Sequence, residues 1–131
     1  MTFDDAHKLI KKGDVLALRR ELDSGMSPDL SNQFSWTLLM LAAMEGNAAM
    51  GDLLVSRGAN VNETNDFGET ALSLAAHGGH LPFVRLLLTR GACTDCRPHG
   101  TTLEGWLSVA SGLPPDKIQA ILDVINGERV G

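Results

Sequence analysis

The chain has 131 residues, of which 44% are hydrophobic, and a formal net charge of −5 at pH 7. A chain of this length can bury one modest core. The acidic balance argues against binding to a phosphate backbone, which requires a basic face, but it excludes no protein partner. No apolar run approaches the roughly 20 residues that cross a bilayer, and the acidic N-terminus does not resemble a secretory signal. We therefore expect no nucleic-acid or membrane partner, and a location in the cytoplasm, with the nucleus as a further site.

Helical segments alternate with glycine-containing turns along the chain. The predicted helices cover, in chain order, residues 4–12, residues 14–24, a segment that follows Thr37, a segment that begins at Ala48, residues 71–77, residues 81–89, residues 102–110, and residues 115 to about 126. In several of them apolar residues recur at i, i+3 and i+4, which predicts one buried stripe per helix. The sequence therefore predicts an all-α protein built from helix pairs.

The segment 66–70 shows how such a helix begins. Asp66 and Gly68 favour a turn, and the hydroxyl of Thr70 can accept a hydrogen bond from the free N–H groups of the first helical turn. The helix is expected to end at Gly78 and Gly79, since glycine accepts the left-handed conformation at a helix C-terminus.

Several residue types recur every 33 residues. One set comprises Gly25, Gly58 and Gly91, a second comprises Gly13, Gly46, Gly79 and Gly112, and Thr37 and Thr70 keep the same interval. A fixed period of this length indicates a stack of identical supersecondary units. Such a stack offers an elongated surface for recognition and no enclosed active site.

These positions carry a resemblance to the ankyrin-repeat family. Residues 66–76 match its turn, its Thr-containing helix start and its Ala-Ala pair, and residues 58–62 match its Gly-Ala-x-Val-Asn connector. The resemblance implies an ankyrin-repeat solenoid of about four stacked helix–turn–helix units with short hairpin-like tips and a concave, protein-binding face. The expected units are an N-terminal cap repeat at 1–30, repeats at 31–63 and 64–96, and a C-terminal cap repeat at 97–131. In size and layout the chain is similar to the ankyrin-type inhibitors of cyclin-dependent kinases.

Gly51 departs from the pattern of the second helix in the repeat 31–63. It stands at the position that Val84 occupies in the next repeat. Glycine within a helix costs about 1 kcal/mol relative to alanine and removes a side chain from the packing. The sequence therefore predicts that this is the weaker of the two internal repeats.

The resemblance also indicates where a partner would bind, namely at the hairpin tips and at the ends of the first helices. The candidate residues there are Gln33, Phe34, Trp36, Met44, Glu45, Asp66, Phe67, Glu69, His77 and His99, and the N-terminal cap adds Phe3, Lys11 and Lys12. Aromatic and methionine residues of this kind are typical of interface hot spots. Packing between tips is the alternative role for Phe34 and Phe67, whereas Trp106 is expected in the core.

Cys93 and Cys96 form a C-x-x-C motif that is followed by His99. A zinc site would require a fourth ligand, for which His77 or His80 is the nearby candidate. A redox pair would need its first cysteine at a helix N-terminus, and here both lie in the connector between two repeats. We therefore expect two ordinary loop thiols and no metal or cofactor.

The function predicted from the sequence is protein–protein interaction without catalysis. No nucleophile stands in a strained turn beside a base, and no glycine-rich phosphate loop with its lysine is present. We expect a monomeric adaptor or regulator that binds one or more proteins through its concave face. Two alternatives stay open, a specific inhibitor of an enzyme such as a protein kinase and a transcription-associated regulator without direct DNA binding. The resemblance also makes Asn62 a candidate for asparagine hydroxylation.

Overall fold

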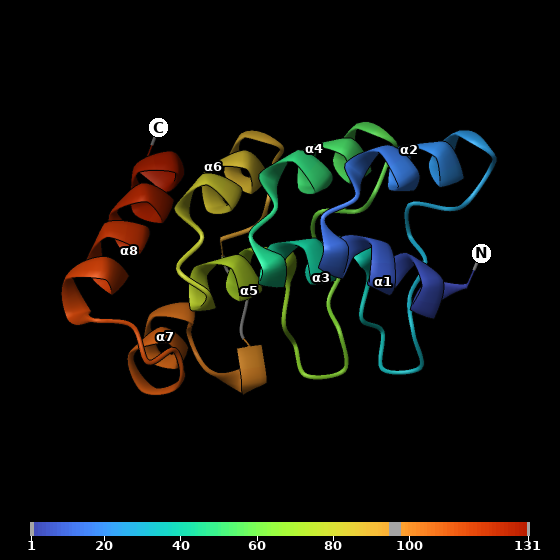
Figure 1. Cartoon of the computed structure of the whole chain (residues 1–131). Helices are drawn as coiled ribbons and strands as arrows, with labels where there is room; N and C mark the ends of the chain where they lie inside the picture. Colours follow the sequence, from blue (N-terminus) through green and yellow to red (C-terminus); the bar gives the residue numbers. More distant parts are fainter. Residues whose placement is uncertain (1, 95–97, 131) are drawn as a thin grey trace.

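A computed structural model describes residues 2–94 and 98–130 as a stack of antiparallel helix pairs (Figure 1). The helices of these residues are α1 (Phe3–Lys12), α2 (Val15–Asp23), α3 (Leu38–Glu45), α4 (Ala48–Ser56), α5 (Ala71–His77), α6 (Leu81–Thr89), the short 3-10 helix η1 (Pro98–Gly100), α7 (Leu103–Ala110) and α8 (Pro115–Val130). Within these described ranges, extended pairing is limited to one isolated bridge between Ser31 and Thr37. The predicted all-α solenoid is confirmed.

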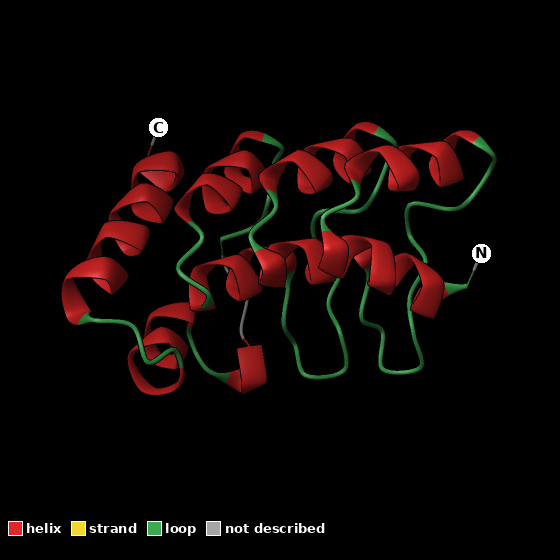
Figure 2. Cartoon of the chain, in the orientation of Figure 1, coloured by secondary structure: helices red, strands yellow, loops and turns green. Residues whose placement is uncertain are grey.

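The helices form two rows. The inner row consists of α1, α3, α5 and α7, and the outer row consists of α2, α4, α6 and α8, with each helix in contact with the next one of its row (Figures 1 and 2). The loops that precede α3 and α5 extend past the inner row (Figure 2). We call residues 31–37 tip 1, residues 64–70 tip 2 and residues 98–102 tip 3. The face made by the inner row and the tips is the one that the family resemblance assigns to binding.

Threonine caps start all four helices of the inner row, and in α1 the hydroxyl of Thr2 accepts a hydrogen bond from the Asp5 N–H at 3.3 Å. The hydroxyls of Thr37, Thr70 and Thr102 each accept a hydrogen bond from the backbone N–H three residues on, at distances of 3.2, 3.2 and 3.1 Å. These bonds satisfy N–H groups that have no partner inside the helix. Gly79 follows α5 with φ of 73°, in the left-handed region where glycine is favoured. The caps predicted at both ends of α5 are therefore confirmed.

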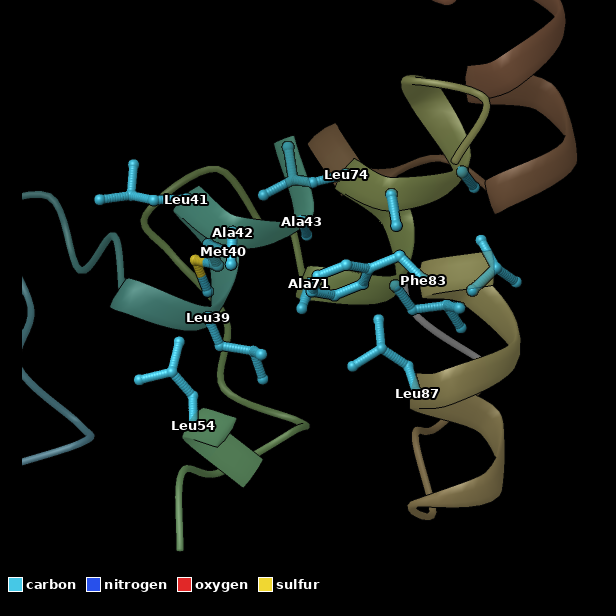
Figure 3. Packing of buried hydrophobic residues seen from close by; sticks show 14 of the residues in the cluster. Leu39, Met40, Leu41, Ala42, Ala43, Leu54, Ala71, Leu74, Phe83 and Leu87 are labelled. Atoms are coloured by element: carbon cyan, nitrogen blue, oxygen red, sulfur yellow. The ribbon is translucent and has the colours of Figure 1, made fainter. Parts of the chain in front are cut away.

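The core lies between the two rows. Figure 3 shows Leu39 of α3 near Leu54, and Phe83 near Ala71. The side chain of Phe83 is fully buried, and Trp106 is 9% exposed, which confirms the core position predicted for it. Full burial of one such side chain contributes about 1.5–3 kcal/mol.

The packing explains why a glycine stands at position 51. Gly51 is buried in α4, and a Cβ atom at this position would lie 2.6 Å from Cζ of Phe83. The space that a side chain would take is therefore filled by the ring of Phe83 from the next repeat. The glycine leaves no gap there, because the missing side chain is what allows α6 to approach α4. That this is the weaker of the two internal repeats stays a prediction.

The last helix differs from the prediction. It continues to Val130, whereas the sequence indicated an end near Asn126. Ile121 and Ile125 are buried as expected. Gly127 lies inside the helix without the positive φ that ends a helix, and no proline follows it, so the backbone hydrogen bonds continue.

Candidate functional site

Each of the first two tips is folded around an asparagine that the sequence interpretation did not single out. The Asn32 Oδ1 accepts hydrogen bonds from the N–H groups of Phe34 and Trp36, at 2.9 and 3.0 Å. The Asn65 Oδ1 accepts from the N–H groups of Phe67 and Glu69 at the same two distances. Asn32 and Asn65 lie 33 residues apart, so the period itself was the signal that could have found them.

Tip 1 lacks the glycine of tip 2 but adopts the same backbone conformation. Ser35 has φ of 64° where Gly68 has 75°. A non-glycine residue in the left-handed region is uncommon and costs of order 1 kcal/mol or more. Ser35 holds this conformation because its own N–H donates to the Asn32 carbonyl, at 3.0 Å, and closes the turn.

A groove lies between α1, tip 1 and α3. Its volume is about 380 Å³, and its lining consists of Phe3, Asp4, His7, Lys11, Asn32, Phe34, Trp36, Leu41, Met44 and Glu45. Phe34 and Met44 are 47% and 50% exposed, so both present apolar surface to solvent. Trp36 is half-buried and packs against the core. The structure thus brings together six predicted contact residues, namely Phe3, Lys11, Phe34, Trp36, Met44 and Glu45.

The residues of α1 that line the groove were predicted only in part from the sequence. Phe3, His7 and Lys11 are spaced by four residues, which places them on one helix face, and the rings of Phe3 and His7 lie 6.3 Å apart. The sequence interpretation named Phe3 and Lys11 but not His7. The four-residue spacing from Phe3 was the signal that identifies it.

Three other predicted residues, Phe67, His77 and His99, gather beyond the groove, around Trp106 of α7. The ring of His77 lies 4.8 Å from that of Trp106, and the ring of His99 lies 5.7 Å from Trp106 and 5.8 Å from Phe67. Phe67 is 47% exposed. Phe67 therefore packs against tip 3 and is also partly exposed, although the sequence analysis treated packing and exposure as alternatives.

Glu69 does not lie where a partner could reach it. Its residue is 7% exposed. Its carboxylate accepts a hydrogen bond from the Asn65 Nδ2, at 2.8 Å, and lies 3.1 Å from the His99 Nε2. A buried carboxylate is retained where such partners satisfy it, so Glu69 holds tip 2 against tip 3. Its exposure as a contact residue, expected from the sequence, is corrected here, whereas Gln33 and Asp66 are exposed as expected.

Only the first cysteine of the C-x-x-C motif lies within the described residues. Cys93 is exposed with a free thiol, and Cys96 lies outside the described residues. Over the part of the chain that the structure describes, no three His, Cys, Asp or Glu side chains are grouped so that they could hold a metal ion. The Nε2 of His80 instead lies 3.1 Å from the Met44 carbonyl oxygen and links α6 to the end of α3.

Asn62 bridges two connectors. Its Oδ1 accepts a hydrogen bond from the Cys93 N–H, at 2.7 Å, and its Nδ2 donates to the Gly91 carbonyl, at 3.4 Å. The side chain is exposed as well as bonded. Hydroxylation of Asn62 stays a prediction.

Charged contacts lie mostly on the outer row. Arg57 pairs with Asp23 at 2.5 Å and Arg90 with Asp52 at 2.6 Å. All four side chains are at least one-third exposed, so each pair contributes little to stability.

At α1, hydrogen bonds from the Thr2 backbone N–H and hydroxyl lower the pKa of the Asp5 carboxyl. Among the described helices none is long and apolar enough to cross a membrane.

The two rows of stacked helix pairs define a helical repeat protein, in which the groove beside tip 1 is the candidate site. The family model described as ankyrin repeats in three copies matches residues 6–102. Because the match covers well over half of the chain, the protein belongs to the ankyrin-repeat family. Ankyrin repeats are generally protein–protein interaction modules, and proteins built from them are typically not catalytic.

Curated relatives match one segment of the chain. The protein named "Ankyrin repeat, SAM and basic leucine zipper domain-containing protein 1" is 44% identical over 55 residues in Homo sapiens and in Nomascus leucogenys, and 42% identical in Atelerix albiventris. The matched segment is 42% of this chain and 12% of each relative. The chain thus spans a small part of the length of these relatives.

Proposed function

We propose that the protein acts as a small adaptor or regulator that binds a protein partner through the groove between α1, tip 1 and α3, without catalysis. The observation that carries this proposal is the pair of half-exposed apolar side chains, Phe34 and Met44, on the rim of one groove. Because these side chains lie outside the core, the stability of the fold does not explain why they are apolar. An exposed apolar cluster in a groove is typical of an interaction site.

The composition of the groove supports a protein ligand. Trp36 supplies an aromatic surface that the core already holds in place, so little conformational entropy is lost when a partner packs on it. Rigid aromatic anchors of this kind carry much of the binding energy in protein interfaces. Asp4, Lys11 and Glu45 border the apolar surface with charges of both signs, as polar rims commonly do.

The test compares affinity-purified partners of the wild-type protein with those of Trp36→Ala and Met44→Ala, quantified by mass spectrometry. Both variants should lose about tenfold or more of the captured partner, since truncating a hot-spot residue costs about 2 kcal/mol. Val109→Ala is the matched control, because Val109 is 89% exposed but lies on α7, away from the groove. An adaptor should retain several unrelated chains, and an enzyme inhibitor one dominant enzyme.

The same variants can reject the assignment. If Trp36→Ala and Met44→Ala capture as much partner as Val109→Ala, the groove is not the binding site. If they lower the thermal unfolding temperature but not the captured amount, their role is in the core.

A further inference from the structure

His80 forms a hydrogen bond with the helix that carries one rim of the groove. Its Nε2 lies 3.1 Å from the carbonyl oxygen of Met44, although the two residues are 36 positions apart in the chain. Because a carbonyl oxygen can only accept, the imidazole donates this bond. His80 directly precedes α6, and Met44 lies in the last turn of α3. The bond therefore ties one wall of the groove to the next repeat.

The equivalent residues of the two earlier repeats act differently. Asp14 and Asn47 precede His80 by 66 and 33 positions. Asp14 caps α2 by accepting from the Ala17 N–H, at 3.1 Å, and Asn47 caps α4 by accepting from the Met50 N–H, at 3.1 Å. Among the described residues, the His80 side chain makes no capping bond to α6. At this position of the third unit, the side chain thus serves the preceding helix pair and not its own helix.

The bond completes the capping of α3. The last carbonyl groups of a helix have no partner inside the helix. The N–H groups of Gly46 and Asn47 donate to two carbonyl groups of α3, at 3.2 Å each. The next carbonyl along the chain is that of Met44, and His80 satisfies it.

The charges at the end of α3 make an outside donor useful. A basic side chain in the last turn of a helix interacts favourably with the free carbonyl groups and the helix dipole. α1 has Lys11 and Lys12 in its last turn, whereas α3 has no basic residue there and ends in Glu45. A negative charge is unfavourable at a helix C-terminus, so the donor that α3 lacks comes from His80.

Two glycines hold the His80 ring closely. A Cβ atom at Gly46 would overlap the ring at Nδ1, and a Cβ atom at Gly78 would lie 2.6 Å from its Cδ2. Gly46 follows α3 and Gly78 follows α5, so the ring is packed between the ends of two inner helices. This packing keeps its Nε2 opposite the Met44 carbonyl.

The consequence for binding concerns the side chain of Met44. It is 50% exposed and lines the groove, and it projects from the last turn of a helix, where helices fray. A partner that packs on a frayed turn must order it, which lowers the affinity. A bond to the backbone of Met44 holds this turn in place before a partner arrives.

We propose that His80 is a positioning residue for the groove. By capping α3 from the next repeat, it keeps the last turn of α3 ordered, so that Met44 presents its side chain to a partner. His80 itself is not part of the groove lining. This inference rests on the proposed function and adds to it a residue outside the groove that sets the affinity.

The test uses a peptide as the probe. It is selected from a displayed library of random short sequences on the immobilised wild-type protein, and it is retained only if Met44→Ala weakens its binding. Isothermal calorimetry then compares His80→Ala, which removes the donor, with His80→Gln, which keeps a side-chain N–H. Asp14→Ala is the matched control, because it removes the cap of α2 and leaves the groove lining unchanged.

His80→Ala should weaken the binding of the probe by about two- to tenfold, the effect of having to order one long side chain on binding. His80→Gln should restore most of the affinity. Asp14→Ala should lower the thermal unfolding temperature and bind the probe as the wild type does. His80→Phe, which fills the space of the ring without a donor, should behave as His80→Ala does and replaces it if His80→Ala folds poorly.

Two further measurements distinguish positioning from a purely structural role. In a Met44→Ala background, His80→Ala should cause no further loss of affinity, because His80 acts through Met44. In the free protein, His80→Ala should speed hydrogen exchange at the Gly46 and Asn47 N–H groups, which bond to the end of α3, and His80→Gln should restore their protection.

The outcomes also separate this inference from the proposed function. If His80→Ala lowers the unfolding temperature but not the affinity for the probe, the groove remains the binding site and the positioning role is wrong. If the losses caused by His80→Ala and Met44→Ala add, His80 does not act through Met44, and the inference is again wrong. If no selected peptide depends on Met44, the proposed function fails and this inference fails with it.

Discussion

Replacing Gly51 with alanine should destabilise the protein, although alanine is the better helix former. On helix propensity alone, Gly51→Ala would raise the free energy of unfolding by about 1 kcal/mol. The structure predicts the opposite sign. A Cβ at Gly51 would lie 2.6 Å from Cζ and 2.7 Å from Cε2 of Phe83, and 3.2 Å from Cδ2 of Leu86.

The magnitude follows from how far the ring must move. Carbon atoms in contact are ordinarily about 3.5–4.0 Å apart, so the Phe83 ring would have to shift by about 1 Å. The ring is fully buried, and it cannot turn into solvent. Overpacking of this kind costs about 1–3 kcal/mol. Subtracting the propensity gain of about 1 kcal/mol leaves a destabilisation of up to about 2 kcal/mol.

The assay is urea unfolding followed by circular dichroism and by tryptophan fluorescence. Trp36 and Trp106 lie toward opposite ends of the stack, so coincident transitions would show that the repeats unfold together, as two-state analysis requires. Gly127→Ala is the control. That glycine is helical, and a Cβ at its position would meet no atom within 4 Å, so alanine there should be neutral or stabilising by up to about 1 kcal/mol.

A double-mutant cycle isolates the contact. In a Phe83→Leu background the smaller side chain leaves room for a methyl group, so Gly51→Ala should become neutral or stabilising. The coupling free energy between the two positions should be about 1–3 kcal/mol. If Gly51→Ala stabilises the wild-type protein as much as Gly127→Ala does, the close approach of Phe83 to α4 is wrong.

Two further predictions concern polar contacts. Asn65→Ala should lower the free energy of unfolding by about 1–3 kcal/mol, because it leaves buried groups of tip 2, including the Glu69 N–H, without their acceptor. Hydrogen exchange at the Glu69 amide should become faster in this variant. Unchanged protection of that amide would count against the role of Asn65. The lowered pKa of Asp5 stabilises the start of α1 above the ordinary value of 3.8, and that stabilisation is lost as pH falls through the lowered value. An NMR titration should show Thr2→Ala raising the Asp5 pKa; no change would refute the capping box.

The sequence predicted the scaffold well because the scaffold is periodic. The Thr70 cap and the buried Trp106 follow from local patterns that a helix imposes on its own residues, and the structure confirms them. The role of Gly51 could not be predicted in this way. Whether a glycine leaves a gap or admits a neighbour depends on Phe83, which lies 32 positions away and meets it only in the stack.

The candidate site was predicted in composition but not in arrangement. Phe34, Trp36 and Met44 were recognised from their chemistry, and the structure places them around one groove. Glu69 was named with them because the family resemblance places binding at the hairpin tips. Its burial depends on contacts with Asn65 of tip 2 and His99 of tip 3. A local sequence pattern does not indicate that the side chain of His99 lies close to that of Glu69.

The most direct test of the binding face is an NMR map of the protein with a captured partner. We predict that the Met44 methyl group and the Trp36 indole N–H shift together, while the resonances of α2, α4 and α6 stay in place. Shifts confined to the outer row, with Met44 and Trp36 unchanged, would contradict this assignment of the binding face.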